Sequence, residues 1–469
     1  MTAVRRTLLA LAVCALSGCA TSPAYKRPTL DLPPAWSAEA PWRQATPRDA
    51  AARSAWWRRF GDAKLDALEQ RAGANSPSLE LAAARLAQAR SALAAAQGVS
   101  LPQVGLSERV SRQQISANRP LSNYASPNFA TVQSELSLAM SVNYEIDLAG
   151  RVQQTIAGAR ASAEQSAADL ENTRLVLSAD LASNYFNLRA IDNELRVLGQ
   201  SIALQQRALE FVNARHQLGV ASGLDLAQQQ ALLESTQVQR ELMRRQRALF
   251  EHAIGTLAGI PAAQFALPPE EREWTTPAIP LGLPSDLLER RPDIAAAERA
   301  MAVANAQIGV ANAAYYPSIT LGTAAGYDSR ELALLFDAPS VLWSIGLSAA
   351  QTLFDGGRTR ANVEFAQAGY AATVAIYRRT VLVAMQEVQD AISGLALLGR
   401  AGEQAGTAVG AARKVLDMTT ARYEGGASAY IDVITAQQSL LAAQRQAAQV
   451  NGQQMLTTVF LVKALGGDW

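Results

Sequence analysis

One stretch of the chain alternates apolar and polar residues with a period of two, which is typical of β-strands. In residues 132–148, all even-numbered positions except Ser134 are apolar, and most of the odd-numbered positions are polar. At about 3.3 Å per residue, a strand of this length spans about 60 Å. Val104, Leu106 and Val110 predict a weaker partner strand just before it.

The second half of the chain offers a matching pair of strands. Residues 319–327 and 341–347 also alternate, with apolar side chains at most odd-numbered positions. We therefore predict one strand pair in each half, at 102–148 and 317–354. Such strands fit either a half-buried sheet packed on helices or a membrane barrel with a lipid-facing side and a wet lumen. Strands this long, with no packing domain beside them, favour the barrel.

Four strands cannot close a barrel, and an open edge in lipid would leave backbone groups without hydrogen bonds. The chain must therefore assemble with copies of itself. Two copies would give eight strands, whose interior side chains fill, whereas three copies would give twelve strands and an open pore. We predict a homotrimer with a 12-stranded transmembrane β-barrel.

Long tracts without proline predict helices. No proline lies between Pro127 and Pro261, and none follows Pro339. Within the first tract, residues 188–212 place mainly apolar side chains alternately three and four positions apart, a coiled-coil rhythm. A helix over about 151–218 would be roughly 100 Å long at about 1.5 Å per residue. A globular core needs no helix of this length.

Small residues interrupt both helical tracts. Residues 219–223 read Gly-Val-Ala-Ser-Gly, and residues 425–428 read Gly-Gly-Ala-Ser. Because such residues break a helix and permit a tight turn, we predict long helical hairpins at 151–257 and 358–465. The fold class is thus an α+β membrane protein in which a β-barrel continues into a coiled-coil helical barrel.

The chain also repeats itself. The motif that begins at Ala214 returns at Ala421, and Gly150 returns at Gly357, an offset of 207 positions in both cases. Upstream the offset is 215, as from Pro102 to Pro317. Two such halves predict an internal two-fold pseudo-symmetry. The predicted domains are a signal peptide (1–18), an N-terminal tether and equatorial segment (19–75), the first repeat (76–261), an equatorial crossover (262–291) and the second repeat (292–469).

The N-terminal residues predict export. Arg5 and Arg6 precede a short apolar run that ends in Leu-Ser-Gly-Cys at Cys19, the form of a secretory signal. This ending resembles a bacterial lipoprotein signal, which implies that Cys19 carries a covalent lipid; a chance cysteine near an ordinary cleavage site is the alternative. Ala20, rather than aspartate, after the cysteine implies sorting to the outer membrane.

Composition gives little support to an enzyme. The only cysteines are Cys14 and Cys19, and the only histidines, His216 and His252, lie 36 positions apart on predicted helices. No Walker or Rossmann glycine motif occurs, and a net charge of +1 gives no reason to expect nucleic acid. We expect no catalytic residues, no metal site and no cofactor other than the lipid on Cys19.

Three motifs carry a resemblance to a known family. Residues 54–62, Ser-Ala-Trp-Trp-Arg-Arg-Phe-Gly-Asp, and residues 283–294, Leu-Pro-Ser-Asp-Leu-Leu-Glu-Arg-Arg-Pro-Asp-Ile, resemble the opening and mid-chain motifs of the NodT-type outer-membrane efflux lipoproteins. Residues 422–426, Arg-Tyr-Glu-Gly-Gly, followed by Asp432, resemble the hairpin tip of the wider TolC-like outer membrane factor family. Ala63 departs from the family's usual proline, and Thr435 stands where some relatives place a second constricting acid.

The resemblance implies a passive, trimeric exit duct that performs no covalent chemistry. Its barrel would sit in the lipid of the outer membrane, and its helices would lie in the periplasm. The implied partners are a periplasmic adaptor (membrane fusion) protein and an inner-membrane pump of the resistance-nodulation-division (RND) class.

The same resemblance points to the hairpin tips as the gate. Asp432 matches the pore-narrowing acid, and Asp225 is its partner in the repeat; a solvated acid near a helix start is the alternative for both. Arg422 and Tyr423, with Asp417 and Arg215, are candidates for weak links that hold neighbouring hairpins closed, although ordinary surface charges would look the same. The predicted adaptor-contact tips are Gly219, Val220, Ala221, Ser222, Gly425, Gly426, Ala427 and Ser428.

Two other functions stay open from the sequence. One is the exit channel of a type I protein secretion system, against which the lipoprotein signal and the NodT-like motifs argue. The other is a non-conducting coiled-coil scaffold lipoprotein of the envelope, which would need no amphipathic strands. The exported substrate does not follow from the sequence.

Overall fold

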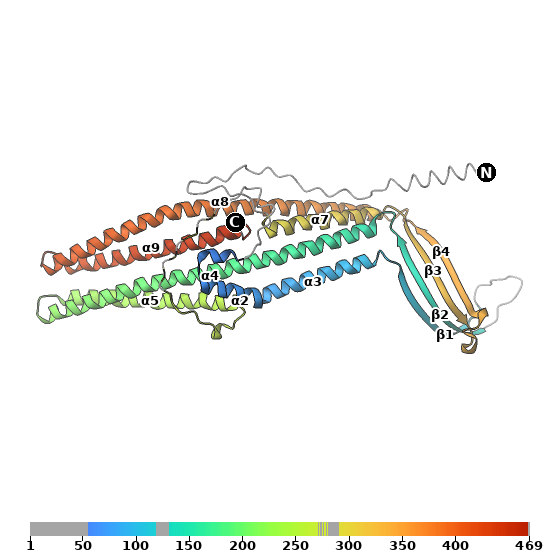
Figure 1. The fold of residues 1–469 in the computed structure, drawn as a ribbon, viewed down its shortest axis with the longest axis horizontal. Coiled ribbons are helices and arrows are strands. Elements are labelled where there is room, and N and C mark those ends of the chain that lie inside the picture. The colour runs from blue at the N-terminus through green and yellow to red at the C-terminus, as the bar shows by residue number, and fades with distance from the viewer. Residues whose placement is uncertain are drawn as a thin grey trace. The chain divides into compact units, whose positions relative to one another are not determined.

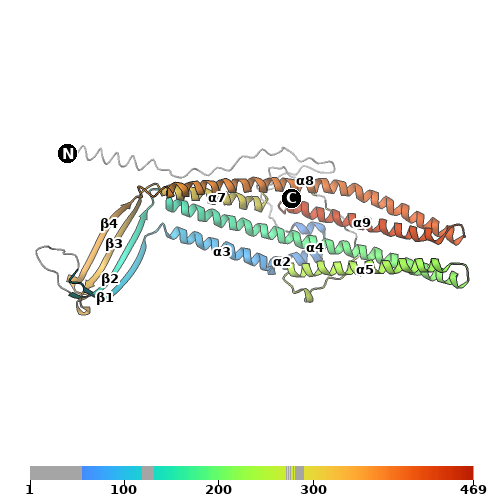
Figure 2. The same ribbon diagram turned by 180° about the vertical axis from the view of Figure 1, so that it is seen from behind.

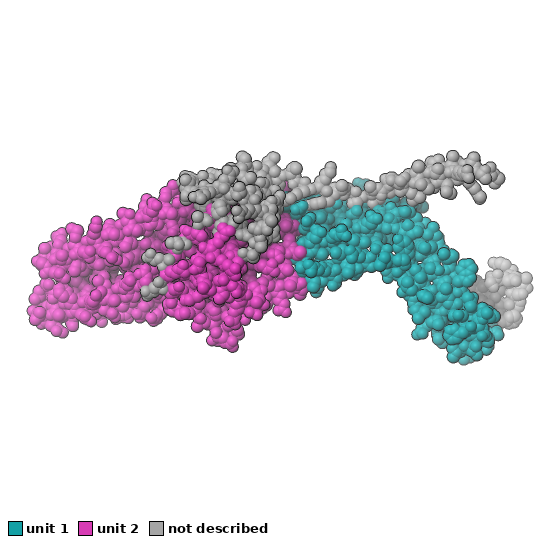
Figure 3. All heavy atoms as spheres, in the orientation of Figure 1, with its two compact units in different colours: residues 1–29, 86–166, 297–377 teal, residues 30–85, 167–296, 378–469 magenta. Residues whose placement is uncertain are grey.

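The computed structural model describes residues 55–118, 131–270, 272, 274, 276, 277, 279 and 290–467. The predicted signal peptide, Cys19 and most of the mid-chain motif lie outside these residues. The described residues form two compact units, one of residues 86–166 and 297–377 and the other of residues 55–85, 167–296 and 378–467 (Figure 3). Each unit therefore takes residues from both halves of the repeat.

The first unit contains a four-stranded antiparallel sheet (Figure 1). Its strands are β1 (Gln103–Ile115), β2 (Thr131–Ile146), β3 (Ser318–Ser329) and β4 (Val341–Ala350), which pair in chain order. The short helices η4 (Leu332–Leu334) and η5 (Ala338–Ser340) join β3 to β4. The central pair, β2 with β3, joins a strand of the first repeat to a strand of the second.

The register of the sheet gathers apolar side chains on one face. Trp343 lies opposite Ala325, which lies opposite Met140, which lies opposite Leu106. Positions that alternate with these carry polar or small residues on the other face, such as Ser141. Successive side chains of a strand point to opposite faces, so the period-two pattern in the sequence is confirmed as a sheet with one apolar side.

Aspartates anchor the strand-to-helix connections of the first unit. The carboxylate of Asp147 accepts hydrogen bonds from the backbone amides of Val152 and Gln153 at 3.1 and 2.8 Å, at the start of α4 (Arg151–Gln217). Asp355 accepts one from the amide of Thr359 at 2.8 Å, at the start of α8 (Arg358–Glu424). A carboxylate at a helix start satisfies amides that have no partner within the helix.

Two further helices, α3 (Pro77–Gly98) and α7 (Pro292–Ala313), precede β1 and β3. Like α4 and α8, they have residues in both units. Both begin at the proline of the repeat, where proline's missing amide costs no helical hydrogen bond.

The second unit is built from two long helical hairpins. One joins α4 to α5 (Gly223–Leu257), and the other joins α8 to α9 (Tyr430–Ala464). The hairpins lie side by side in both views (Figures 1 and 2). Residues of all four helices share one buried cluster, which consists of Val212, Leu232, Leu416, Tyr423, Tyr430, Val433, Ile434, Ala436 and Leu440. The long helices and the four strands that the sequence predicts are confirmed.

Short elements pack against the base of the hairpins. They are η1 (Trp56–Phe60), α2 (Ala63–Asn75) and η2 (Ala262–Gln264). Phe60 packs against Phe186 of α4 with ring centroids 4.8 Å apart, and Phe186 lies 5.7 Å from Trp274. Aromatic side chains therefore attach the segment that precedes α2 to the helical body.

Candidate functional site: the tips of the two helical hairpins

The tip of the first hairpin is a tight turn with a capped second helix. Gly219 has a φ of 76°, which a residue with a Cβ rarely adopts, and the Val220 amide bonds back to the Arg215 carbonyl at 2.9 Å. Ser222 and Asp225 then form a capping box, in which each side chain accepts a hydrogen bond at 3.1 Å from the other's backbone amide. The carboxylate of Asp225 is thus engaged within its own turn.

The tip of the second hairpin has the same turn without the cap. Gly426 has a φ of 73°, and the Ala427 amide bonds to the Arg422 carbonyl at 2.7 Å. The N-cap of α9 is Ala429, which has no side-chain oxygen to accept a hydrogen bond. Asp432 occupies the position in α9 that Asp225 occupies in α5, but its carboxylate is exposed and has no hydrogen bond within the described residues. Of these two acids, Asp225 alone has its carboxylate engaged in a cap.

Two tyrosines join the hairpins behind the tips. Tyr423 at the end of α8 and Tyr430 at the start of α9 are 8% and 3% exposed, with ring centroids 4.9 Å apart. The Tyr430 hydroxyl donates a hydrogen bond of 2.8 Å to Oε1 of Gln229 in α5. The guanidinium of Arg215 in α4 lies 5.1 Å from the centre of the Tyr423 ring, within the range of a cation–π contact.

Burial raises the pKa of both tyrosines, and the nearby charge of Asp225 raises them further. For Tyr423, the positive charge of Arg215 partly opposes the rise. Both phenols therefore stay protonated at neutral pH, so the Tyr430 hydroxyl remains a hydrogen-bond donor.

The structure brings only some of the predicted gate residues together. Arg215 meets Tyr423 across the two hairpins. Arg422 instead reaches its own turn, where it donates a hydrogen bond of 3.4 Å to the Ala427 carbonyl. Asp417 is exposed on α8 and has no ion pair within the described part of the chain.

The two predicted contact tips differ in the surface that they expose. Val220 on the first tip is 63% exposed, and its neighbours Leu218 and Leu224 are 78% and 66% exposed. The second tip exposes the smaller residues Gly425, Gly426 and Ala427. Ala221 and Ser428 are half-buried at the equivalent positions of the two turns. The first tip thus presents an aliphatic surface and the second a nearly smooth backbone.

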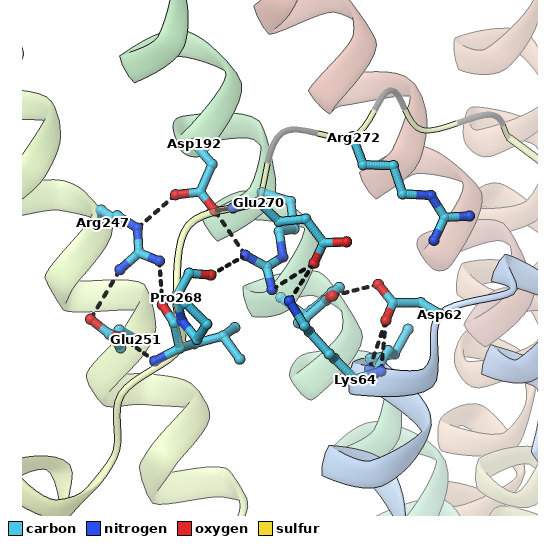
Figure 4. Close-up of polar contacts among 12 residues, drawn as sticks. Asp62, Lys64, Asp192, Arg247, Glu251, Pro268, Glu270 and Arg272 are labelled. Carbon is cyan, nitrogen blue, oxygen red and sulfur yellow. Dashed lines mark hydrogen bonds and ion pairs between the residues drawn. The ribbon is translucent and has the colours of Figure 1, made fainter.

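A buried ionic network lies away from the tips, at the base of the first hairpin (Figure 4). Arg189 and Asp192 of α4 have almost no exposed side-chain surface, and their charged groups lie 2.8 Å apart. Asp192 also receives a 2.6 Å contact from Arg247 of α5. The two arginines donate to the backbone carbonyls of Pro268 and Leu267. The network therefore fastens the segment after α5 onto both helices.

The same network reaches α2. Glu270 lies 2.8 Å from Lys64, and its backbone amide donates to Asp192. Asp62 caps α2 through the amides of Lys64 and Leu65, and it also accepts the hydroxyl of Tyr185 from α4. This cluster was not predicted from the sequence. Its one local signal is the Arg-x-x-Asp spacing of Arg189 and Asp192 on an otherwise apolar helix face.

No group of three or more histidine, cysteine, aspartate or glutamate side chains gathers into a possible metal site within the described residues. What the tips offer is a set of polar contacts between the hairpins and exposed acids, Asp432 among them.

Fold and site together define a class of membrane protein in which a strand pair and a long helical hairpin occur twice in each chain. The chain belongs to the outer membrane efflux protein family, whose family model matches residues 68–259 and 283–467. It is therefore an outer-membrane protein of efflux, as the sequence motifs implied.

Individual relatives agree with the family. The pyoverdine export outer membrane protein OpmQ of Pseudomonas putida strain KT2440 is 32% identical over 447 residues, which cover 94% of this chain and 93% of that protein. A crystal structure of a membrane protein from Pseudomonas aeruginosa has a TM-score of 0.88 and 28% identity, and covers 96% and 98% of the two chains. The outer-membrane channel OprN has a TM-score of 0.87 and 25% identity, with coverage of 96% and 99%.

Proposed function

We propose that three copies of this chain form the exit duct of a tripartite efflux system. The duct would conduct small molecules passively from an inner-membrane RND-class pump, through a periplasmic adaptor protein, to the outside of the cell. The hairpin tips would form its gate. The lipid on Cys19 would add an anchor in the outer membrane, and the duct would need no cofactor.

The sheet carries this proposal. β1 and β4 each pair along one edge only within the described chain, and the sheet has one apolar face. On β4 this face leaves Trp343 75% and Ile345 69% exposed. Lipid would cover such a face, and pairing of β4 with β1 of the next copy would satisfy both free edges. Three copies bring together twelve strands, enough for a lumen.

The internal repeat indicates how the helices of neighbouring copies would pack. Within the chain, α9 lies close against α4: a Cβ on Gly452 would lie 2.7 Å from the Cβ of Ala190. Arg445 of α9 also forms an ion pair of 3.2 Å with Glu194 of α4. By pseudo-symmetry, α5 should pack in the same way against α8 of a neighbouring copy.

The surfaces that this packing requires are exposed in the single chain. A shift of 207 positions takes Gly452 to Arg245 and Ala190 to Leu397. Leu397 is 60% exposed, and Val238 and Leu242 of α5 are 60% and 56% exposed. Covering these side chains with a second copy would remove apolar surface from water, the main driving force of association.

The gate proposal rests on the tips. Three copies of Asp432 would place a ring of carboxylates at the mouth, where a ring of acids attracts cations. The links at Tyr423, Arg215 and Arg422 are individually weak, so a docking adaptor could open them. The aliphatic surface at Val220 and the exposed backbone at Gly425 and Gly426 offer that adaptor two kinds of contact.

Reconstitution of the purified full chain in planar bilayers tests the function. We expect stepwise conductance with a preference for cations, and a particle mass of three chains in detergent. The absence of conductance at every salt concentration and voltage used to open the gate would instead support the non-conducting scaffold. A protein-secretion channel would be indicated if the neighbouring pump gene encoded an ABC transporter and deletion of this chain stopped export of a polypeptide.

A further inference from the structure

A layer of buried polar side chains crosses the interface between the two hairpins just behind their tips. Gln205 of α4 and Gln229 of α5 are both 0% exposed, and Gln437 of α9 is 4% exposed. Their surroundings are apolar, with Leu232 and Ile434 in the adjoining cluster. A buried amide is costly unless its hydrogen bonds are made, so packing alone does not account for this layer.

Gln229 lies at the centre of the layer. Its Nε2 donates a hydrogen bond of 2.9 Å to the backbone carbonyl of Gln205, and its Oε1 accepts the 2.8 Å bond from the Tyr430 hydroxyl. The Gln229 side chain of α5 therefore binds α4 of its own hairpin and also Tyr430, the first residue of α9 in the other hairpin.

Two acceptors in the layer are unused. Oε1 of Gln205 and Oε1 of Gln437 are buried and have no hydrogen-bond partner among the described residues. Nε2 of Gln205 donates to Ser201 at 3.1 Å. A donor that shifts along the interface between the hairpins can therefore meet a second acceptor in place of an apolar wall.

The repeat keeps only one glutamine of this layer. A shift of 207 positions takes Gln205 to Ala412, Gln229 to Ala436, and Tyr430 back to Gly223. The hydrogen-bonding side chains of Gln205, Gln229 and Tyr430 are therefore absent from the equivalent positions, whereas Gln437 corresponds to Gln230. Ala412 and Ala436 themselves lie in the cluster that the two hairpins of one chain bury between them. The fold itself does not require them, because the equivalent helix pair is built with alanine.

We propose that Gln229 is a positioning residue of the gate, whose hydrogen bond to Tyr430 latches the second hairpin against the first in the closed arrangement. The proposal rests on the proposed duct function. Tyr430 lies two residues before Asp432 and packs on Tyr423, which stacks with Arg215. Release of its hydroxyl would free the start of α9, and with it the Asp432 carboxylate, to move from the closed position.

Three variants of the full chain test the latch. Tyr430→Phe removes only the hydroxyl, Gln229→Leu removes the amide, and the double variant removes both. Each single variant leaves a buried group without its partner and should lower the unfolding temperature. The double variant replaces both with apolar groups and should recover part of that loss. A matched control is Thr236→Val, since Thr236 is also fully buried in α5 but bonds only to its own helix at Leu232.

Conductance in planar bilayers separates a latch from a purely structural bond. We expect the open probability to rise about five- to tenfold in all three variants, as expected from loss of one neutral hydrogen bond, and to stay unchanged in Thr236→Val. A double variant that recovers stability and also closes like the wild type would overturn the latch. So would a rise of equal size in the Thr236→Val control.

Hydrogen exchange gives a second readout that does not need conductance. Amides of the first turn of α9 should exchange faster in Tyr430→Phe and in the double variant than in Thr236→Val. If neither the wild type nor any variant conducts, the duct function fails while exchange still decides the latch. Unchanged exchange at the start of α9 would refute it.

Discussion

At the residue scale, one buried acid should make stability depend on pH. Burial raises the pKa of Glu69 in α2 from its usual 4.5 to about 9, and the residue is 4% exposed. The folded chain therefore keeps this proton to a higher pH than the unfolded chain does. The protonated Glu69 carboxyl therefore makes its full contribution to the free energy of unfolding below about pH 4.5. That contribution is lost as the pH rises towards 9.

Glu69→Gln removes this titration and should flatten the pH dependence. At pH 8 the free energy of unfolding of the variant should exceed that of the wild type by up to about a few kcal/mol, because the pKa shift of Glu69 is large. Near pH 4 the two should be alike. Thermal unfolding in detergent from pH 4 to pH 9 measures this difference, and parallel curves for the two proteins would contradict it.

A second residue-scale prediction concerns the buried ionic network. Asp192→Ala would leave Arg189 and Arg247 without their shared carboxylate, and breaking a buried pair by removing one partner costs about 3–5 kcal/mol. Glu241→Ala is the control, because Glu241 pairs with Arg240 and Arg244 on the exposed side of α5. We expect a marked fall in unfolding temperature for Asp192→Ala and little change for Glu241→Ala. Equal changes of unfolding temperature in the two variants would show that the ionic network does not stabilise the base of the hairpin.

At the element scale, the two tips differ in one capping residue, and that difference should set the charge at the mouth. Ala429→Ser would give α9 the capping box that Ser222 gives α5, since Asp432 already stands at the third helical position. The new cap should stabilise the first turn by about 1 kcal/mol and engage the Asp432 carboxylate in the turn.

Ion selectivity should follow that carboxylate. We expect Asp432→Ala to weaken the cation preference most, Ala429→Ser to weaken it partly, and Asp225→Ala to leave it nearly unchanged because Asp225 is engaged in its cap. Reversal potentials under a salt gradient compare the three variants. A larger effect for Asp225→Ala than for Asp432→Ala would show that the carboxylate ring lies at the first tip and not at the second.

These elements also show what the sequence could and could not predict. The strands and hairpins depend on local periodicity and on small residues at the turns, so both were visible along the chain. The capping box was not predicted, although its signal, Ser222 three residues before Asp225, is present in the sequence. The ionic network was not predictable, because Asp192 and Glu270 meet only after the chain folds back on itself. The same holds for Gln229 and Tyr430, which are about 200 positions apart.

At the scale of the whole molecule, the repeat makes a prediction about how copies meet. Within the chain, Gly452 of α9 approaches Ala190 of α4 more closely than a Cβ would allow. Their equivalents, Arg245 and Leu397, are both exposed in the single chain. If three copies close a ring of six similar hairpins, Arg245 of each copy should lie next to Leu397 of its neighbour.

Cysteine cross-linking can test this contact because the only native cysteines are Cys14 and Cys19 at the N-terminus. A chain with Arg245→Cys and Leu397→Cys should give covalent dimers and trimers on mild oxidation, and no larger species, since a closed ring of three has no free partner. Arg245→Cys with Leu218→Cys is the matched control, because Leu218 is also exposed, at 78%, but lies at the tip of the same hairpin. A ladder that continues past three chains would refute the closed trimer. Monomers alone would refute the pseudo-symmetric packing of α5 on α8.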